Sequence, residues 1–323
     1  MKRLATALAV CALLIPAANA FGGDFTWNGE KSDVWTYHKN WTGPAGEYPD
    51  DAGDDVTIND LDWLPTGTKY VPNVNAAVTI RDLTMIGNAT GNAYHAKLSF
   101  NSANDLTVTG MTELSDDVDL LQVYPNTGIL IVGVIEVKAV ATVLNNVPDV
   151  EASSLRIDAD DAGGDRLFEK AGTGAMSVSG SVILYGDDES AGRATFQYTD
   201  QFTDDSFSAS HFDMDGRGYD GGEAVLDIDA TLDMSPSTDI AAEGYCEIDV
   251  ENGDTFTVRA VTVDATAGRA QISQVTGTGK VEATSLTITA GDSEAEPPED
   301  AVYLLSAGTL DVNGKVELYG PTG

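Results

Sequence analysis

One five-residue pattern recurs through most of the chain and limits the possible folds more than any other feature. It consists of an apolar residue, any residue, a second apolar residue, any residue, and then Gly or Ala. Copies begin at Leu83, Leu106, Ile129, Leu155, Met176, Phe212, Leu226, Val261, Leu286 and Leu310. They start on average about 25 residues apart, with one irregular stretch around Leu226. The alternation predicts strands, and the small fifth residue permits a bend.

A strand-rich repeat of this length is typical of a solenoid. A propeller blade needs four strands and roughly 40 residues, which is more than the period allows. We therefore expect an all-β protein in which residues 78–323 form a right-handed parallel β-helix with repeats of about 25 residues. Inward positions would carry ladders of Val, Ile and Leu. An antiparallel β-sandwich is the alternative, because the spacing around Leu226 is irregular.

The strongly negative charge of the chain excludes some classes of binding partner. Lys and Arg number 17 against 52 Asp and Glu, which gives a formal net charge of −35. Nucleic-acid binding requires a basic face that neutralises phosphates, so we expect no nucleic-acid partner. We also expect no membrane insertion, because beyond the first 20 residues no apolar stretch approaches the roughly 18 residues of a membrane helix. With 42% hydrophobic residues the chain can still bury a core.

Residues 1–20 have the three parts of a secretory signal peptide. The segment opens with two basic residues, continues as an apolar stretch from Leu4 to Ile15, and ends in the cleavage signal Ala18-Asn19-Ala20. This stretch is too short to span a bilayer. We expect the mature chain to begin at Phe21 and to be secreted or held at the cell surface.

Cleavage there would leave a single cysteine, Cys246, in the given sequence. No intramolecular disulfide is then expected. The flanking residues read as a strand, so we interpret Cys246 as a small buried hydrophobe rather than a reactive thiol.

Residues 21–77 differ from the rest and are predicted to be an N-terminal cap. All the tryptophans lie here, at Trp27, Trp35, Trp41 and Trp63. An open solenoid end exposes strand edges and apolar ladders, which a bulky aromatic segment would cover. The alternative is a carbohydrate site in which sugar rings stack on exposed tryptophan faces.

Two stretches carry more specific motifs. The first contains Trp27-Asn-Gly29, Trp35-Thr-Tyr37, Asn40-Trp41, Pro49 and Asp54-Asp55-Val56-Thr-Ile58-Asn59. The second is Phe168-Glu-Lys170-Ala-Gly172-Thr-Gly174-Ala-Met176-Ser-Val178-Ser-Gly180, with a partial copy at Gly277-Thr-Gly279. Together they resemble secreted bacterial proteins with autotransporter-associated β-strand repeats. The resemblance implies a β-helical passenger or surface protein, usually without catalysis.

The best candidate metal site is Asp213-x-Asp215-Gly216-x-Gly218-x-Asp220. Alternating carboxylates with glycines let several oxygens converge on a hard cation, so Asp213, Asp215 and Asp220 are candidate ligands for Ca²⁺. The alternative is an acidic, glycine-rich turn without metal. Weaker candidates are Asp158 with Asp160, Asp161 and Asp165, and the pairs Asp50-Asp51 and Asp54-Asp55.

The sequence favours a structural role over catalysis. It shows no nucleophile elbow, phosphate loop or Ser/His/Asp spacing, and His38, His95 and His211 are isolated. We therefore expect a secreted or cell-surface β-solenoid that is structural or adhesive. The alternative is a carbohydrate-active β-helix, either a polysaccharide lyase or a glycan-binding protein. The candidate partner in both cases is an extracellular glycan or another surface component.

The end of the sequence suggests a further contact. The alternating residues Leu310 to Leu318 are followed by a short tail that provides no aromatic or helical cap. Unless the sequence is a fragment, we expect this end to dock against something. End-to-end self-association is the candidate.

Overall fold

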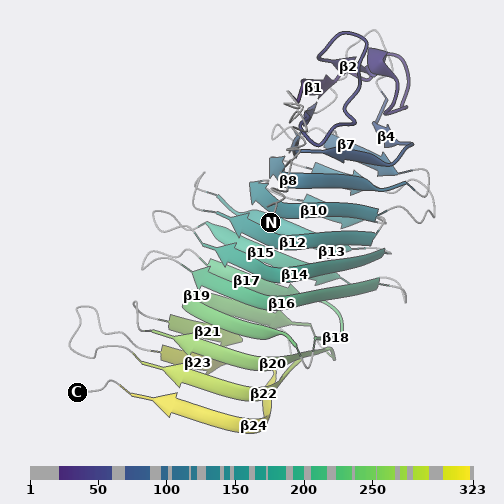
Figure 1. Cartoon of the computed structure of the whole chain (residues 1–323). Coiled ribbons are helices and arrows are strands. Elements are labelled where there is room, and N and C mark those ends of the chain that lie inside the picture. The colour runs from purple at the N-terminus through teal and green to yellow at the C-terminus, as the bar shows by residue number, and fades with distance from the viewer. Residues whose placement is uncertain are drawn as a thin grey trace, which may run out of the picture.

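A computed structural model shows a single stack of strands, from the N-terminal cap at one end to β24 (Thr309–Tyr319) at the other (Figure 1). One sheet connects all these strands. The structure describes residues 22–59, 70–87, 96–100, 104–115, 118–121, 129–138, 142–145, 149–159, 164–171, 174–186, 192–199, 205–216, 223–234, 237–251, 253–265, 270–274, 279–290 and 301–320. The helical element within them is a single 3₁₀ turn, η1 (His38–Asn40).

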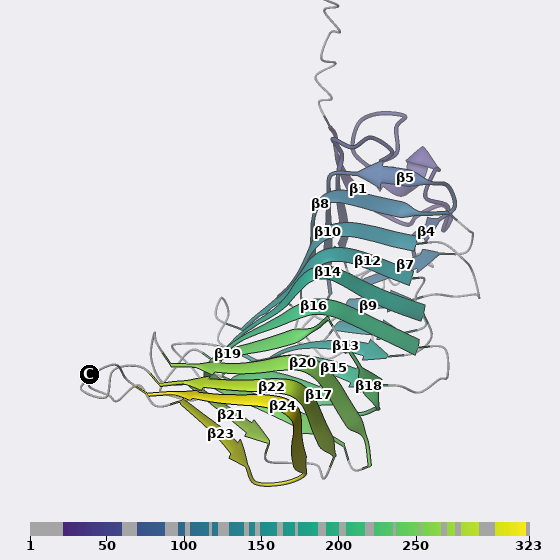
Figure 2. The ribbon, with the colours of Figure 1, turned by 60° about the horizontal axis from the view of Figure 1, so that its bottom comes forward.

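The strands form three parallel ladders, which we call the first, second and third faces. Long strands bend from the first face into the second: β8 (Leu106–Ser115), β10 (Ile129–Lys138), β12 (Asp149–Asp158), β14 (Gly174–Tyr185), β16 (Asp205–Gly216), β20 (Thr255–Asp264), β22 (Lys280–Thr289) and β24. Figure 2 shows that they follow one another in chain order along the stack.

Shorter strands form the third face. They are β4 (Asn73–Val74), β7 (Ala96–Phe100), β9 (Val118–Leu121), β11 (Thr142–Asn145), β13 (Arg166–Ala171), β15 (Arg193–Thr199), β17 (Glu223–Ile228), β21 (Ala270–Gln274) and β23 (Ala301–Leu305). One strand, β19 (Asp239–Val250), serves the second and third faces in turn. On the first face, β5 (Val78–Ile80) and β18 (Leu232–Asp233) complete the ladder.

The second-face ladder continues into the cap. It runs from β6 (Asp82–Ile86) to β3 (Asp55–Asn59) and then to β1 (Asp24–Trp27), all parallel. Among the described strands, only β2 (Trp41–Thr42) pairs antiparallel with its neighbour, which is β1. A β-sandwich consists of antiparallel sheets, so this pairing pattern excludes that alternative and confirms the β-helix.

The small fifth residue of the repeated pattern stands at the corners of the coil. At Gly133 and at Gly180, an added Cβ would lie 2.6 Å from a backbone oxygen of the preceding coil. Side chains cannot approach backbone that closely, so glycine is required at these two corners between the first and second faces.

The strand register explains the irregular spacing around Leu226. Most copies of the pattern lie on the first or second face, whereas Leu226 lies on the third, in β17. The second-face equivalent in that region is Ile240, which pairs with Phe212 on one side and Val261 on the other. Second-face partners are separated by 20 residues between Ile135 and Leu155 and by 30 between Val182 and Phe212.

The interior is a column of mostly apolar side chains, with a few buried polar residues such as Lys170 and Gln274. Inward residues of β14, Met176, Val182 and Leu184, are at most 1% exposed. Phe168 and Phe196 stack on successive coils with ring centroids 6.0 Å apart, and Phe207 packs on Phe196 at 4.7 Å. Burial of each such side chain contributes roughly 1.5–3 kcal/mol, so the column supplies the main stabilisation of the coils. Within the described part of the chain, no helix is both long and apolar enough to cross a membrane.

Candidate functional site

Three tryptophans of the first motif form the core of the cap. Trp27, Trp35 and Trp41 are 3%, 0% and 6% exposed. Trp41 lies between the other two, with ring centroids 4.8 Å from Trp27 and 4.7 Å from Trp35. Their ring faces are therefore covered by protein and are closed to stacking by a sugar. The carbohydrate alternative is therefore excluded for these three rings, while Trp63 lies outside the described residues.

Each buried indole N–H has a backbone acceptor. Trp27 donates to the Tyr70 carbonyl at 2.7 Å, and Trp35 donates to the Pro49 carbonyl at 2.9 Å. Trp41 donates to the carbonyl of Trp35 at 2.7 Å. A buried tryptophan N–H needs such a partner. The bonds of Trp27 and Trp35 also connect cap segments 43 and 14 residues apart in sequence.

Asn40 organises the loop before the last of these tryptophans. Its side chain is fully buried, and its Oδ1 accepts from the backbone N–H groups of Lys31 at 3.2 Å and Ser32 at 3.0 Å. Its Nδ2 donates to the Ser32 hydroxyl at 2.9 Å and to the Val34 carbonyl at 2.8 Å. The Asn-Trp pair of the motif therefore has a structural role in this chain.

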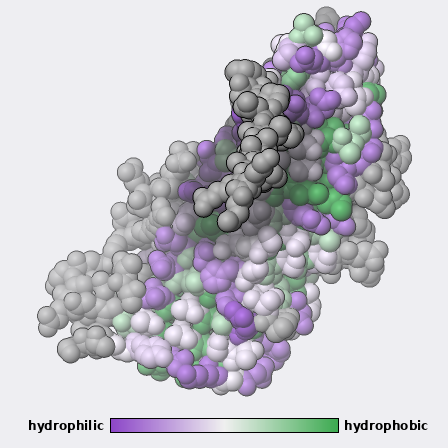
Figure 3. Space-filling view, in the orientation of Figure 1, coloured by the Kyte–Doolittle hydropathy of each residue, from purple (hydrophilic) through white to green (hydrophobic). Residues whose placement is uncertain are grey.

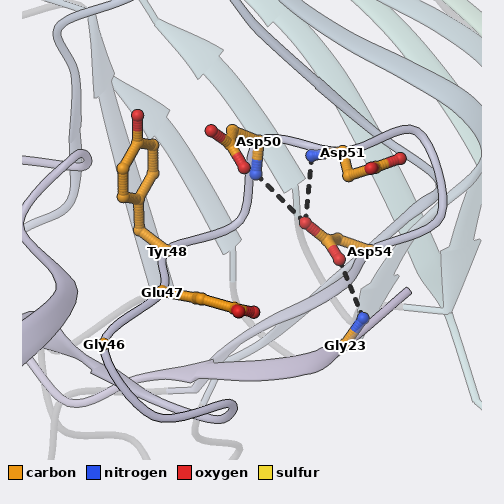
Figure 4. A pocket seen from close by; sticks show the side chains of 7 residues that line it. All are labelled: Gly23, Gly46, Glu47, Tyr48, Asp50, Asp51 and Asp54. Carbon is orange, nitrogen blue, oxygen red and sulfur yellow. Dashed lines mark hydrogen bonds between the residues drawn. The ribbon is translucent and has the colours of Figure 1, made fainter. Parts of the chain in front are cut away.

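A pocket of about 420 Å³ opens on the surface of the cap. It is lined by Gly23, Gly46, Glu47, Tyr48, Asp50, Asp51 and Asp54 (Figure 4). Burial and the neighbouring Asp50 raise the pKa of Tyr48. The lining combines one aromatic ring with several carboxylates, which are groups that can contact sugar hydroxyls and sugar rings.

Asp54 has a structural role in this pocket. Its Oδ1 accepts from the Gly23 N–H at 2.8 Å, and its Oδ2 accepts from the N–H groups of Asp50 at 3.1 Å and Asp51 at 3.0 Å (Figure 4). A carboxylate with three backbone donors is held in place. Asp55 points elsewhere and forms an ion pair with Arg81. The Asp54-Asp55 pair is thus divided between two structural contacts.

The structure places two of the three predicted calcium ligands on one face of β16. Asp213 and Asp215 are both partly exposed and alternate with the buried Phe212 and Met214. His211 lies next to them, with its Nε2 2.9 Å from Asp213 Oδ1. Asp220 lies outside the described residues. Among the described residues, no group of three or more His, Cys, Asp or Glu side chains is arranged to hold a metal ion.

The weaker candidate metal site, which begins at Asp158, is also only partly within the described residues. Asp158 is 4% exposed and forms an ion pair with Arg156, whose guanidinium also lies over the Tyr185 ring at 5.0 Å. Asp160 and Asp161 lie outside the described residues.

Basic side chains bridge carboxylates of successive coils. Arg81 contacts Asp55 and Asp82, and Lys138 contacts Glu113 at 3.6 Å and Glu136 at 3.7 Å. Arg193 and Lys280 form the same kind of bridge, from Arg193 to Glu223 and Glu247, and from Lys280 to Glu282 and Asp311. Like charges stacked on successive coils repel each other. The Arg and Lys side chains that lie between these carboxylates reduce that repulsion.

A cluster of carboxylates lies on the outer side of the third face. Asp227 of β17 is directly paired in register with Asp249 of β19. Burial, together with the negative charges of Asp229 and Asp249, raises the pKa of Asp227 to about 7. Gln197 donates to Asp229 Oδ2 at 2.8 Å. The Asp227 carboxyl therefore changes charge near neutral pH.

Cys246 is 3% exposed, and burial raises the pKa of its thiol to about 12. The interpretation as a buried hydrophobe is confirmed, because a reactive cysteine needs access and a lowered pKa. Of the histidines, His38 is exposed on η1, His211 is on β16, and His95 lies outside the described residues.

Comparison with protein families, with curated proteins and with solved structures found no match to this chain. The face shown in Figure 3 mixes hydrophilic and hydrophobic residues.

Proposed function

We propose that this protein is a secreted or cell-surface β-solenoid that acts as a structural or adhesive element. The observation that carries the proposal is the continuous parallel stack, whose outward carboxylates are bridged from coil to coil by Arg and Lys. Such a stack presents long columns of outward residues on a rigid support, which suits repeated weak contacts with an extended partner. The resemblance of residues 27–59 to surface proteins with β-strand repeats supports the same role.

Export tests the first half of the proposal. The full chain is produced in a Gram-negative bacterial host, and the periplasmic fraction and medium are analysed by mass spectrometry. We expect a product that begins at Phe21. A matched variant, Leu13→Arg with Leu14→Arg, interrupts the apolar stretch and should stay in the cytoplasm uncleaved. Wild-type protein that also stays uncleaved in the cytoplasm would contradict secretion.

Binding to a surface tests the second half. The purified protein is applied to a glycan array and to immobilised extracellular polysaccharides, with and without calcium. A structural or adhesive role predicts binding or assembly without loss of polymer length. Shortening of an acidic polysaccharide would instead identify a lyase.

The carbohydrate-active alternative has one observation in its favour, the pocket that contains Tyr48. If this pocket binds glycan, Tyr48→Ala should abolish binding on the array, because the variant removes the only aromatic ring of the lining. Tyr37→Ala is the matched control, since Tyr37 is an exposed tyrosine of the same cap outside the pocket lining. If Tyr48→Ala bound glycan as well as Tyr37→Ala does, the pocket would be excluded as the glycan-binding site.

We also propose that Asp213 and Asp215 contribute to a calcium site with Asp220. Both described side chains lie on one face of β16, so their oxygens can approach the same ion. Calcium should then raise the melting temperature of the wild type. The double variant Asp213→Ala and Asp215→Ala should lose that shift, and an unchanged shift would clear these residues of the role.

A further inference from the structure

The C-terminal end of the stack exposes residues that belong to the interior. Val316 and Leu318 are in register with Leu286 and Ile288, which lie against the core in the coil before. In the last strand these same inward positions are 54% and 72% exposed. Among the described strands, β24 pairs with β22 alone, and Figure 1 shows no strand beyond it. An edge of this kind is a template for another strand.

At the opposite end of the stack, the described second-face edge is already covered. At the N-terminal end, β1 pairs with β3 on one side, and its other side is already occupied by the antiparallel strand β2. The buried Trp27 and Trp41 close this end further. Head-to-tail stacking of copies would therefore have to displace β2 from β1. A contact between two identical ends needs no such displacement, and it closes as a dimer.

The sequence of β24 is symmetric about its bend. It reads Leu310-Asp-Val312-Asn-Gly314-Lys-Val316-Glu-Leu318, so that apolar and acidic residues occur at equal distances on both sides of Gly314. An antiparallel pairing of two copies centred on Gly314 places Leu310 opposite Leu318 of the second copy. The same pairing places Val312 opposite Val316 of the second copy. All four inward apolar positions would then meet apolar partners.

The shape of the coil permits this pairing. Gly314 stands at the corner between the first and second faces, like Gly133 and Gly180 in earlier coils. A two-fold axis through that corner exchanges the first face of one copy with the second face of the other. In a three-faced coil the same axis passes through the middle of the third face, so the two β23 strands also face each other. Their Leu304 and Leu305 are 43% and 47% exposed.

The charges at the edge are already balanced within each copy. The pairing places Asp311 opposite Glu317 of the second copy, which alone would be repulsive. In each chain, however, Lys280 Nζ lies 2.9 Å from Asp311 Oδ2, and Lys315 forms an ion pair with Glu317. Each carboxylate at the contact is therefore already neutralised by a lysine of its own chain.

We propose that β24 is a self-association edge, through which two copies of this chain join end to end as a closed, two-fold symmetric dimer. The interior column and the outer sheet would then run continuously through both copies. This proposal stands apart from the proposed surface role, because a secreted adhesive solenoid can also be monomeric.

Sedimentation of the purified protein tests the proposal. We expect a dimer at about 10–100 μM and no larger species, because an isologous contact closes. Leu318→Lys should weaken association at least about tenfold, because a buried charge in the contact is costly. Met111→Lys is the matched control: it introduces the same charge at an exposed apolar residue far from β24 and should leave the dimer intact. A monomeric wild type, a filament, or a dimer that Leu318→Lys leaves unchanged would overturn the proposal.

Disulfide trapping tests the register independently. In a Cys246→Ser background, Val312→Cys combined with Val316→Cys should give a covalent dimer under mild oxidation. Each single variant should stay monomeric after denaturation, because neither position lies opposite itself. Cross-linking by a single variant, or none by the double variant in a sample that sedimentation shows to be dimeric, would contradict the register centred on Gly314.

Discussion

A few basic side chains reduce the repulsion between carboxylates in this strongly acidic chain. Four basic residues, Arg81, Lys138, Arg193 and Lys280, each contact carboxylates on two coils. A single surface ion pair contributes little. A bridge between stacked carboxylates also removes the repulsion between them. We therefore expect each bridge to contribute more to the stability of the stack than a single surface ion pair does.

Asp227 predicts how stability depends on pH. Its pKa in the folded protein is about 7, above the ordinary value of 3.8, because it is partly buried beside Asp229 and Asp249. A raised carboxyl pKa means that its contribution to stability is fully present below the ordinary pKa and is lost as pH rises through about 7. We therefore expect the melting temperature to fall between about pH 5 and about pH 8.

The variant Asp227→Asn should flatten that fall, because the amide does not ionise. Asp24→Asn, an exposed carboxylate on β1, serves as the control and should leave the slope unchanged. The measurement is thermal denaturation followed by circular dichroism at several pH values. An equal slope for wild type and Asp227→Asn would contradict the assignment.

Strands and corners were predictable from sequence to different degrees. The alternation of Leu106 and Val108 before Gly110 predicts both the strand and the bend, and the structure has both. The same five-residue pattern occurs on all three faces, however, so it could not show that Leu226 belongs to the third face. Faces are distinguished by register with neighbouring coils, and register is a property of contacts about 20 to 30 residues away.

The candidate sites show the same limit. Alternation correctly places Asp213 and Asp215 on one side of a strand, because successive side chains of a strand point to opposite faces. The role of Asp54 was not predictable, since one of its hydrogen bonds reaches Gly23, 31 residues earlier. The tryptophan motif predicted an aromatic cap, and the structure adds the backbone acceptors that fix each indole.

The corner at Gly244 offers a test of close coil packing. Gly244 has a φ of +67°, and an added Cβ would lie 2.1 Å from the Gly216 carbonyl oxygen. Gly244→Ala should lower the free energy of unfolding by more than the ~1–2 kcal/mol that the backbone conformation alone costs.

The matched control for this corner is Gly253→Ala. Gly253 has a φ of +96° with nothing within 4 Å of an added Cβ, so it should show the conformational cost without the clash. Urea denaturation measures both values. Equal losses in the two variants would contradict the close approach of the coils at Gly244.

The whole molecule combines a net charge of −35 with a narrow, extended core. Repulsion among its outward carboxylates opposes folding, and salt screens that repulsion because the Debye length shortens from ~10 Å at 0.1 M to ~3 Å at 1 M. We therefore expect the melting temperature to rise with sodium chloride. The same osmolality of sucrose controls for general solvent effects, and a flat response to salt would count against the electrostatic account.

The central claim is that the chain forms one stack of parallel coils in continuous register, and disulfide trapping between adjacent coils tests it most directly. Ser177 and Ser208 are exposed register partners on β14 and β16, whereas Ser206 is offset from Ser177 by two residues. Parallel partners lie ~4.8 Å apart, within the ~4.4–6.8 Å that a disulfide spans, and the offset pair lies beyond it. In a Cys246→Ala background, Ser177→Cys with Ser208→Cys should form an intramolecular disulfide readily, and Ser177→Cys with Ser206→Cys should not. Failure of the first pair, or equal cross-linking of both, would contradict the parallel register.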